Sequence, residues 1–282
     1  MDRNDEIRSV VSKTYAKRVT TPAQPSCCGP SKSDCGAAKL AGYGDDELAA
    51  LPLDAVEHSF GCGDPLSFAE VKEGDVVVDL GSGAGIDILL AARKVGPTGR
   101  AIGVDMTDEM IDKARGNIAA AGLRNAEVRK GLIEELPIAS GSADWVISNC
   151  VINLSPEKDR VFAEIARVLK PGGRMLVSDI VAHDLPDWAR SSDAFLCACV
   201  GGAISEEEYA AGLKRAGLTD VEVRARFSYS AEQIVAFAES TECSVAAPCC
   251  GDGAPSEDLV KAAAEELAGR VASVKFAARK PG

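Results

Sequence analysis

Apolar runs alternate with amphipathic stretches between residues 75 and 180. Five short β-branched runs predict strands, at 75–80, 100–105, 126–131, 143–149 and 173–180. Amphipathic stretches with helical spacing lie between strands at 85–96, 107–122 and 156–170. Pro156 falls at an early position of the last predicted helix, where a missing N–H is tolerated. Because strands joined by helical crossovers pair in parallel, the pattern predicts a doubly wound, Rossmann-like α/β sheet.

The rhythm changes after residue 181. Further helices and strands are predicted at 185–203, 205–218 and 259–271 (helices) and at 221–230 and 273–280 (strands), with a helix and a Cys-rich loop within 231–255. Residues 20–45 are rich in Pro, Gly, Ser and Ala and lack periodicity. We therefore expect a flexible, Cys-containing extension over 1–50, a core over 51–182, and a smaller α+β region over 183–282 that supplies the last strands.

Composition narrows the class of protein. The 282 residues are 46% hydrophobic and 26% charged, as in ordinary globular domains, and the formal charge of −12 argues against a nucleic-acid partner. The N-terminus MDRNDEIRSVVSKTYAKR lacks the apolar core of a secretory signal, and no apolar run is long enough to span a membrane. We expect a cytoplasmic monomer with no membrane partner.

Ten cysteines are the most unusual feature of the composition. They are Cys27, Cys28, Cys35, Cys62, Cys150, Cys197, Cys199, Cys243, Cys249 and Cys250. In a reducing compartment they are ligands, nucleophiles or core residues rather than a disulfide framework. No C-x-x-C pair occurs, which argues against a structural zinc site.

A glycine loop follows the first predicted strand, in VVVDLGSGAGID. Gly81, Gly83 and Gly85 let the backbone approach a ligand closely at a helix N-terminus, although a tight turn can also serve packing alone. Asp105 ends the second strand, where a carboxylate accepts hydrogen bonds from ribose hydroxyls. The G-x-G-x-G spacing differs from the dinucleotide G-x-G-x-x-G, so a nicotinamide cofactor is the weaker alternative.

The segments VVVDLGSGAG, GVDMTDEMIDKAR and LKPGGRMLVSD resemble, in that order, the motifs of class I S-adenosylmethionine (SAM)-dependent methyltransferases over residues 70–182. The resemblance implies that 51–182 is a SAM-binding core. It also implies a cofactor site in which the methionine part is held by Asp79, Gly81, Gly83 and Gly85, the ribose by Asp105, and the adenine by Met106, Ile133 and Glu134, with Asn149 near the methionine end.

Three cysteines lie in loops that such a fold would bring to the methyl group. Cys150 follows the strand ADWVISN, Cys62 lies between glycines in HSFGCGDP, and Cys199 lies in CVGGA. Each has a simpler interpretation, because free cysteines are often small buried apolar residues. On a continuous helix Cys197 and Cys199 would point about 200° apart, so we expect only one of them to face a shared ligand.

The combination of SFGCGDP, SNCVINLSPEKDRVFAEIARVLKPGGR and CVGGA resembles the arsenite SAM methyltransferases over residues 56–205. The resemblance implies that Cys62, Cys150 and Cys199 are the catalytic, arsenic(III)-binding thiols. Cys27 or Cys28 would cooperate with them, and Cys28 is our choice. It further implies arsenite or arsenic–thiol complexes as substrates, a thiol reductant such as thioredoxin or glutathione, and an arsenic-binding lid within 183–282.

The chemistry agrees with the resemblance. Trivalent arsenic is soft and prefers thiolates, and three sulfurs leave it one lone pair that can attack a sulfonium methyl. Two rivals stay open. One is a methyltransferase for another small molecule, with His183 as general base, and the other is a non-catalytic thiol-rich metalloid binder.

Overall fold

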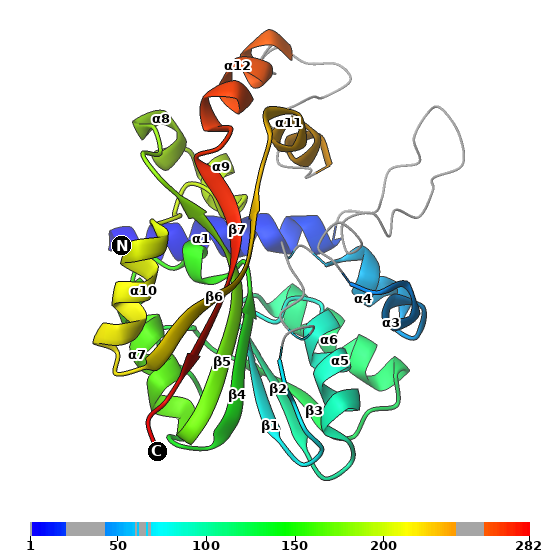
Figure 1. Cartoon of the computed structure of the whole chain (residues 1–282). Coiled ribbons are helices and arrows are strands. Elements are labelled where there is room, and N and C mark those ends of the chain that lie inside the picture. Colours follow the sequence, from blue (N-terminus) through cyan, green and yellow to red (C-terminus); the bar gives the residue numbers. More distant parts are fainter. Residues whose placement is uncertain (1, 21–42, 60, 62–65, 67–68, 241–256) are drawn as a thin grey trace.

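A computed structural model of the chain describes residues 2–20, 43–59, 61, 66, 69–240 and 257–282 (Figure 1). The helices are α1 (Arg3–Thr20), α3 (Asp45–Ala49), α4 (Leu53–Glu57), α5 (Ile86–Val95), α6 (Asp108–Ala120), α7 (Lys158–Val168), α8 (Asp187–Arg190), α9 (Asp193–Cys197), α10 (Glu206–Arg215), α11 (Ala231–Ser240) and α12 (Glu257–Leu267), with a short 3-10 turn η2 (Ile152–Leu154). The strands are β1 (Val76–Leu80), β2 (Arg100–Asp105), β3 (Ala126–Lys130), β4 (Ala143–Asn149), β5 (Leu169–Ala182), β6 (Thr219–Ser228) and β7 (Val271–Arg279).

The strands form one seven-stranded sheet in the order β3-β2-β1-β4-β5-β7-β6. The first five strands pair in parallel, which confirms the predicted doubly wound core. Strand β7 inserts antiparallel between β5 and β6, so the C-terminal region completes the sheet as expected. Chain order reverses between β1 and β4, and in such sheets ligands bind beyond the carboxyl ends of the strands at this point.

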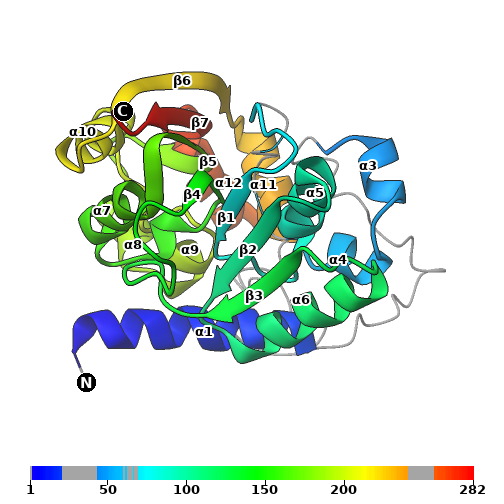
Figure 2. The same cartoon turned by 90° about the horizontal axis from the view of Figure 1, so that it is seen from below.

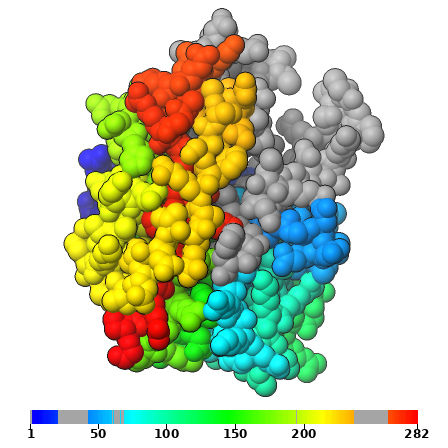
Figure 3. Space-filling model, in the orientation of Figure 1, coloured from blue at the N-terminus to red at the C-terminus, as the bar shows by residue number. Residues whose placement is uncertain are grey.

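Two hydrophobic cores, one on each face, hold the sheet together. Successive residues alternate between them, so that Val77 packs with helices α5 and α6 while Val78 packs with α7 and α10. Figure 2 shows these helices on opposite sides of the strands. In Figure 3 the C-terminal elements, coloured yellow to red, lie on the left of the face shown, and the early βα units, coloured cyan to green, lie at its lower right. The described helices include none with the length and apolar composition needed to cross a bilayer.

Several element boundaries differ from the sequence prediction, and two of these differences bear on the site. Helix α7 begins at Lys158 with Glu157 as its N-cap, so Pro156 precedes the helix instead of lying inside it. The helix predicted over 185–203 is broken into α8 and α9, and α9 ends at Cys197. Cys199 then adopts a left-handed φ of 62°, which a continuing helix excludes.

Helix α1 was not predicted. Its sequence carries charges around most of its circumference, and only Val11 and Val19 are buried. Such a pattern gives a weak amphipathic signal, and the helix is held instead by packing on α6 and α9. Residues 21–42, where the flexible extension was expected, lie outside the described residues.

Candidate active site

A cleft opens at the carboxyl ends of β1, β2 and β4 and holds about 950 Å³ of space, including the solvent at its mouth. One side, which we call the glycine-loop side, is formed by Asp79, Gly81, Ser82, Gly83, Asp105, Met106, Ile133 and Glu134. The other, the cysteine side, is formed by Asn149 and Cys150, with Cys199 directly behind Cys150.

The glycine loop is tied to the end of β2. Gly81 has a φ of 64°, and a Cβ there would come within 2.4 Å of a Val151 methyl, so the position requires glycine. The Gly83 N–H donates to Asp105 Oδ2 at 2.9 Å. A Cβ at Gly83 would meet nothing within 4 Å, because this residue faces the open cleft.

Asp105 holds two backbone donors and is nearly buried. Its Oδ1 accepts from the Thr107 N–H at 2.9 Å, and its Oδ2 accepts from Gly83. Burial raises the pKa of this carboxyl, while the backbone donors act in the opposite direction. Each carboxylate oxygen has a second lone pair, so Asp105 retains acceptor capacity for hydroxyls in the cleft.

Asp79 lies deeper, at the end of β1, and is 3% exposed. Burial, together with the nearby carboxylates of Asp87 and Asp105, holds the pKa of Asp79 well above its ordinary range. No described residue donates a hydrogen bond to its carboxylate. The buried hydroxyl of Ser82 likewise has no partner in the described part of the chain. Two unsatisfied polar groups on one wall indicate a polar ligand.

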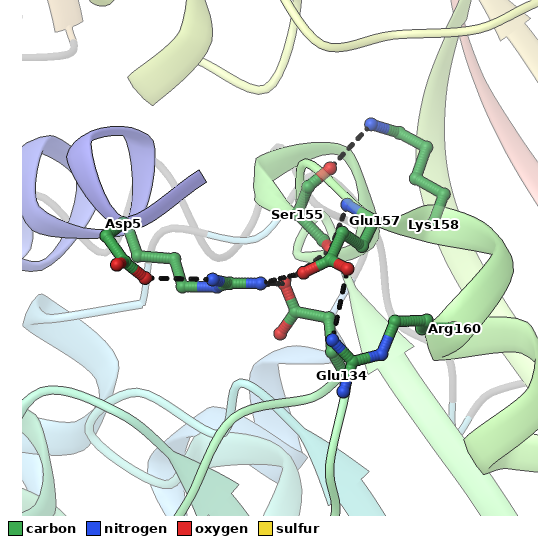
Figure 4. Close-up of polar contacts among 7 residues, drawn as sticks. Asp5, Glu134, Ser155, Glu157, Lys158 and Arg160 are labelled. Atoms are coloured by element: carbon green, nitrogen blue, oxygen red, sulfur yellow. Dashed lines mark hydrogen bonds and ion pairs between the residues drawn. The ribbon is translucent and has the colours of Figure 1, made fainter. Parts of the chain in front are cut away.

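Glu134 closes the far end of the glycine-loop side. Its Oε1 accepts from Ser155 Oγ at 2.7 Å and from Arg8 of helix α1 at 3.3 Å. Arg8 also pairs with Glu157, and Arg160 reaches Glu157 from outside at 3.0 Å. Figure 4 shows these acidic and basic groups between α1 and the segment that follows β4.

Asn149 joins the two sides. Its Nδ2 donates to the Tyr43 hydroxyl at 2.9 Å, and Tyr43 donates in turn to Asp87 at 2.9 Å. Gly61 packs so tightly on Asn149 that a Cβ would come within 2.2 Å of Nδ2. Gly61 also lines the cleft, next in sequence to Cys62. Cys62 itself, like Cys27 and Cys28, lies outside the described residues.

Cys150 and Cys199 have unusual backbones. They are two of the four non-glycine residues with positive φ in the described part of the chain, at 57° and 62°. Such conformations cost about 1–2 kcal/mol each and cluster at functional sites. The Cys199 thiol donates to the Cys150 carbonyl oxygen at 2.7 Å, and the Cys150 N–H donates to the Ser178 carbonyl at 2.8 Å.

The two cysteines differ chemically. Cys150 is disulfide-bonded, whereas Cys199 carries a thiol. Burial and the charge of Asp179 raise the pKa of the Cys199 thiol well above its ordinary value. Cys199 is therefore protonated until a ligand replaces its proton.

Most of the predicted site residues lie together. Of those described, the ones that line the cleft are Asp79, Gly81, Gly83, Asp105, Met106, Ile133, Glu134, Asn149 and Cys150. Gly85 does not line it; this glycine is the N-cap of α5 and packs near Ala114. His183 is also away from the cleft, with its ring beside Glu207 at 3.9 Å.

The sequence prediction missed the residues that α1 contributes. Arg8, Val11 and Tyr15 line the cleft, as do His58 and Ser155. The only sequence signal for the α1 residues is their spacing of three and four, which places them on one helical face.

Comparison with known proteins identifies the family. Residues 71–217 match the family model described as a methyltransferase domain. The crystal structure of an arsenic(III) S-adenosylmethionine methyltransferase from Chlamydomonas reinhardtii superposes with a TM-score of 0.64 at 32% identity, covering 84% of this chain and 72% of that one. The chain belongs to the arsenite SAM methyltransferase family. This membership confirms the resemblance seen in the sequence.

Further family relatives agree but are longer. The arsenite methyltransferase of Halobacterium salinarum is 42% identical over 232 residues, which cover 78% of this chain and 59% of the relative. That of Mus musculus is 34% identical over 212 residues, covering 71% and 54% respectively. The chain thus spans somewhat more than half the length of each of these two relatives.

The cofactor of this family can be tested against the cleft. SAM carries an ammonium group, ribose hydroxyls and a flat adenine. The buried, unsatisfied Asp79 carboxylate suits the ammonium group, and Asp105 retains acceptor capacity for hydroxyls. Met106 and Ile133 offer apolar surface to a ring. The residues present therefore fit SAM.

Proposed function

We propose that this protein transfers methyl groups from SAM to trivalent arsenic held by cysteine thiolates. The observation that carries the proposal is the pairing of Cys150 and Cys199. Both have strained left-handed backbones. The Cys199 thiol lies 2.7 Å from the Cys150 carbonyl oxygen, and Cys150 lines the cleft that the glycine loop also lines. A merely structural cysteine has no need of such a backbone.

On the glycine-loop side, Asp79 would pair with the ammonium group of SAM, and Gly81 and Gly83 would let the methionine part lie against the backbone. Asp105 would accept from the ribose hydroxyls, and Met106, Ile133 and Glu134 would border the adenine. Asn149 would lie near the methionine end, and Gly85 would act only through the turn that it caps. When bound, SAM supplies a sulfonium methyl that a nucleophile can displace.

On the cysteine side, Cys62, Cys150 and Cys199 would bind arsenic, with Cys28 cooperating. The packing of Gly61 on Asn149 supports the inclusion of its neighbour Cys62. Each thiol proton leaves with an arsenite hydroxyl as water, so no separate base is needed for binding. Three thiolates leave arsenic one lone pair, which is the nucleophile, and the protein contributes mainly alignment.

A thiol reductant would be needed to release the sulfur of Cys150. Because Cys150 is disulfide-bonded in the structure, its sulfur must be released before it can bind arsenic. Thioredoxin or glutathione would supply this step, in a cytoplasmic monomer. Residues 51–182 would form the SAM-binding core and 183–282 an arsenic-binding lid.

The decisive experiment is incubation with SAM, arsenite and a thiol, followed by chromatographic arsenic speciation. We expect methylated arsenic and one molecule of S-adenosylhomocysteine for each methyl group transferred. Saturable SAM binding without methylated arsenic would contradict the proposal. The non-catalytic binder would give that result, and methylation of a different acceptor would favour the other rival. His183, the base predicted for the rival methyltransferase, lies outside the cleft lining, whereas His58 lines it.

A further inference from the structure

Helix α1 touches both sides of the cleft. Arg8, Val11 and Tyr15 line it, and their spacing places them on one face of the helix. Figures 1 and 2 show α1 crossing the ends of β2 and β3, where the glycine-loop side lies. The hydroxyls of Ser12 and Thr107 meet at 3.4 Å and tie α1 to the loop after β2.

The first contact lies on the glycine-loop side. Arg8 donates to Glu134 Oε1 through both Nε and Nη2, each at 3.3 Å. The Glu134 side chain is only 4% exposed, and its other described hydrogen bond comes from Ser155. A buried carboxylate keeps its place only while donors satisfy it. Without Arg8, Glu134 would be free to turn away from the cleft.

The second contact lies on the cysteine side. The Tyr15 hydroxyl donates to the Cys197 carbonyl at 3.2 Å and also contacts the Cys199 thiol. The Arg18 guanidinium stacks 4.8 Å from the Tyr15 ring and holds it. Tyr15 therefore restrains the end of α9, where the chain turns into the left-handed Cys199.

We infer that α1 is part of the active site, with Arg8 as the positioning residue for Glu134 and Tyr15 as the positioning residue for Cys199. The inference rests on the proposed function, because it assigns Glu134 to the cofactor and Cys199 to arsenic. It goes further by linking the two half-sites through one helix of the N-terminal segment. Arg8, in the first half of the helix, supports the SAM site, and Tyr15, in the second half, supports the arsenic site.

Two substitutions test the roles of Arg8 and Tyr15 separately. Arg8→Met should raise the dissociation constant for SAM about tenfold while changing that for arsenite less than twofold, since one charge-assisted contact is lost. Tyr15→Phe should raise the dissociation constant for arsenite about fivefold and leave that for SAM unchanged. Arg8→Lys should give an intermediate SAM affinity, because an ammonium group keeps the charge but not the fork. Calorimetry with excess reductant measures both ligands.

Two matched controls are available. Arg160→Met removes the second arginine that pairs with Glu157. The Arg160 side chain is half exposed and does not line the cleft. Tyr209→Phe removes a fully buried hydroxyl that bonds Asp179 at 3.4 Å outside the cleft lining. Neither control should change either dissociation constant by more than twofold. Thermal unfolding of all five variants reports any general loss of stability.

The inference is supported if Arg8→Met weakens the binding of SAM alone and Tyr15→Phe weakens the binding of arsenite alone. Unchanged affinities overturn it, as do parallel losses of both affinities that follow the melting temperature. If the wild type binds SAM but forms no methylated arsenic, the proposed function fails separately. The Arg8→Met result then still decides the cofactor half of the inference.

Discussion

The glycine-loop side and the cysteine side of the cleft are built from the chain in different ways. On the first, the loop and the residues that fix it fall within 79–107, where each contact joins adjacent βα units. On the second, Cys150 and Cys199 are 49 residues apart and meet only because β4 and β5 are neighbours. The glycine loop is local in sequence, whereas the cysteine side is assembled by the fold.

The two sides also differ in how they reach unusual backbone conformations. Gly81 and Gly83 adopt positive φ without strain because they have no Cβ. Cys150 and Cys199 adopt similar angles as cysteines, at about 1–2 kcal/mol each. Glycine suits a position where only the backbone would approach a ligand. A position that must present a thiol cannot be glycine, so Cys150 and Cys199 keep the strained backbone.

The largest effect should come from breaking the cysteine side. Cys150→Ser should reduce arsenite methylation by at least about 100-fold, because a hydroxyl does not replace a soft thiolate ligand. SAM affinity should stay unchanged. Cys62→Ser and Cys199→Ser should behave alike in arsenic speciation assays. Cys35→Ser and Cys243→Ser are the matched controls, and full activity of Cys150→Ser would contradict the assignment.

The next prediction compares two neighbours. Cys199→Ala should abolish or severely slow methylation, whereas Cys197→Ala should retain it. Both residues are buried, so the loss of burial is similar. Only Cys199 places its thiol on Cys150, beyond the end of α9. The reverse order of activities would mean that the wrong thiol has been chosen.

The glycine-loop side gives a smaller effect. Asp105→Ala should weaken SAM binding by roughly 10- to 100-fold, which corresponds to the loss of hydrogen bonds to a charged acceptor, about 1.5–3 kcal/mol. Arsenite affinity measured by calorimetry should stay nearly constant. If both affinities fell together, the two sides would not be independent.

The smallest effect is on stability. Asp179, behind Cys199, is fully buried, and burial raises its pKa to about 7 despite its backbone and Lys158 contacts. In the unfolded chain an aspartate has a pKa near 3.9. Folding therefore favours the protonated form, and stability should be lost as pH rises from about 4 to 7.

Asp179→Asn should remove this dependence. We expect its melting temperature to exceed that of the wild type by roughly 5 °C at pH 8, and by less at pH 5. Scanning calorimetry across this pH range measures the difference. A constant difference at all pH values would show that Asp179 does not titrate on folding.

Much of the fold could be predicted because each βα unit carries its own periodicity. The five parallel strands and the site residues of the glycine loop follow from β-branched runs and glycines read in order. The break between α8 and α9 was missed because composition alone does not show where tertiary contacts end a helix. Helix α1 was missed because its buried face is narrow and its packing partner, α6, is far along the chain.

By itself, the sequence determined the sheet, the cofactor loop and the identity of the reactive atoms, because these depend on local pattern and on residue type. Tertiary structure alone decided which cysteines meet. It placed the Cys199 thiol on the Cys150 carbonyl and laid Arg8 and Tyr15 across the cleft. The physical reason is that contacts between distant segments depend on packing and strand order, which no short stretch of sequence contains.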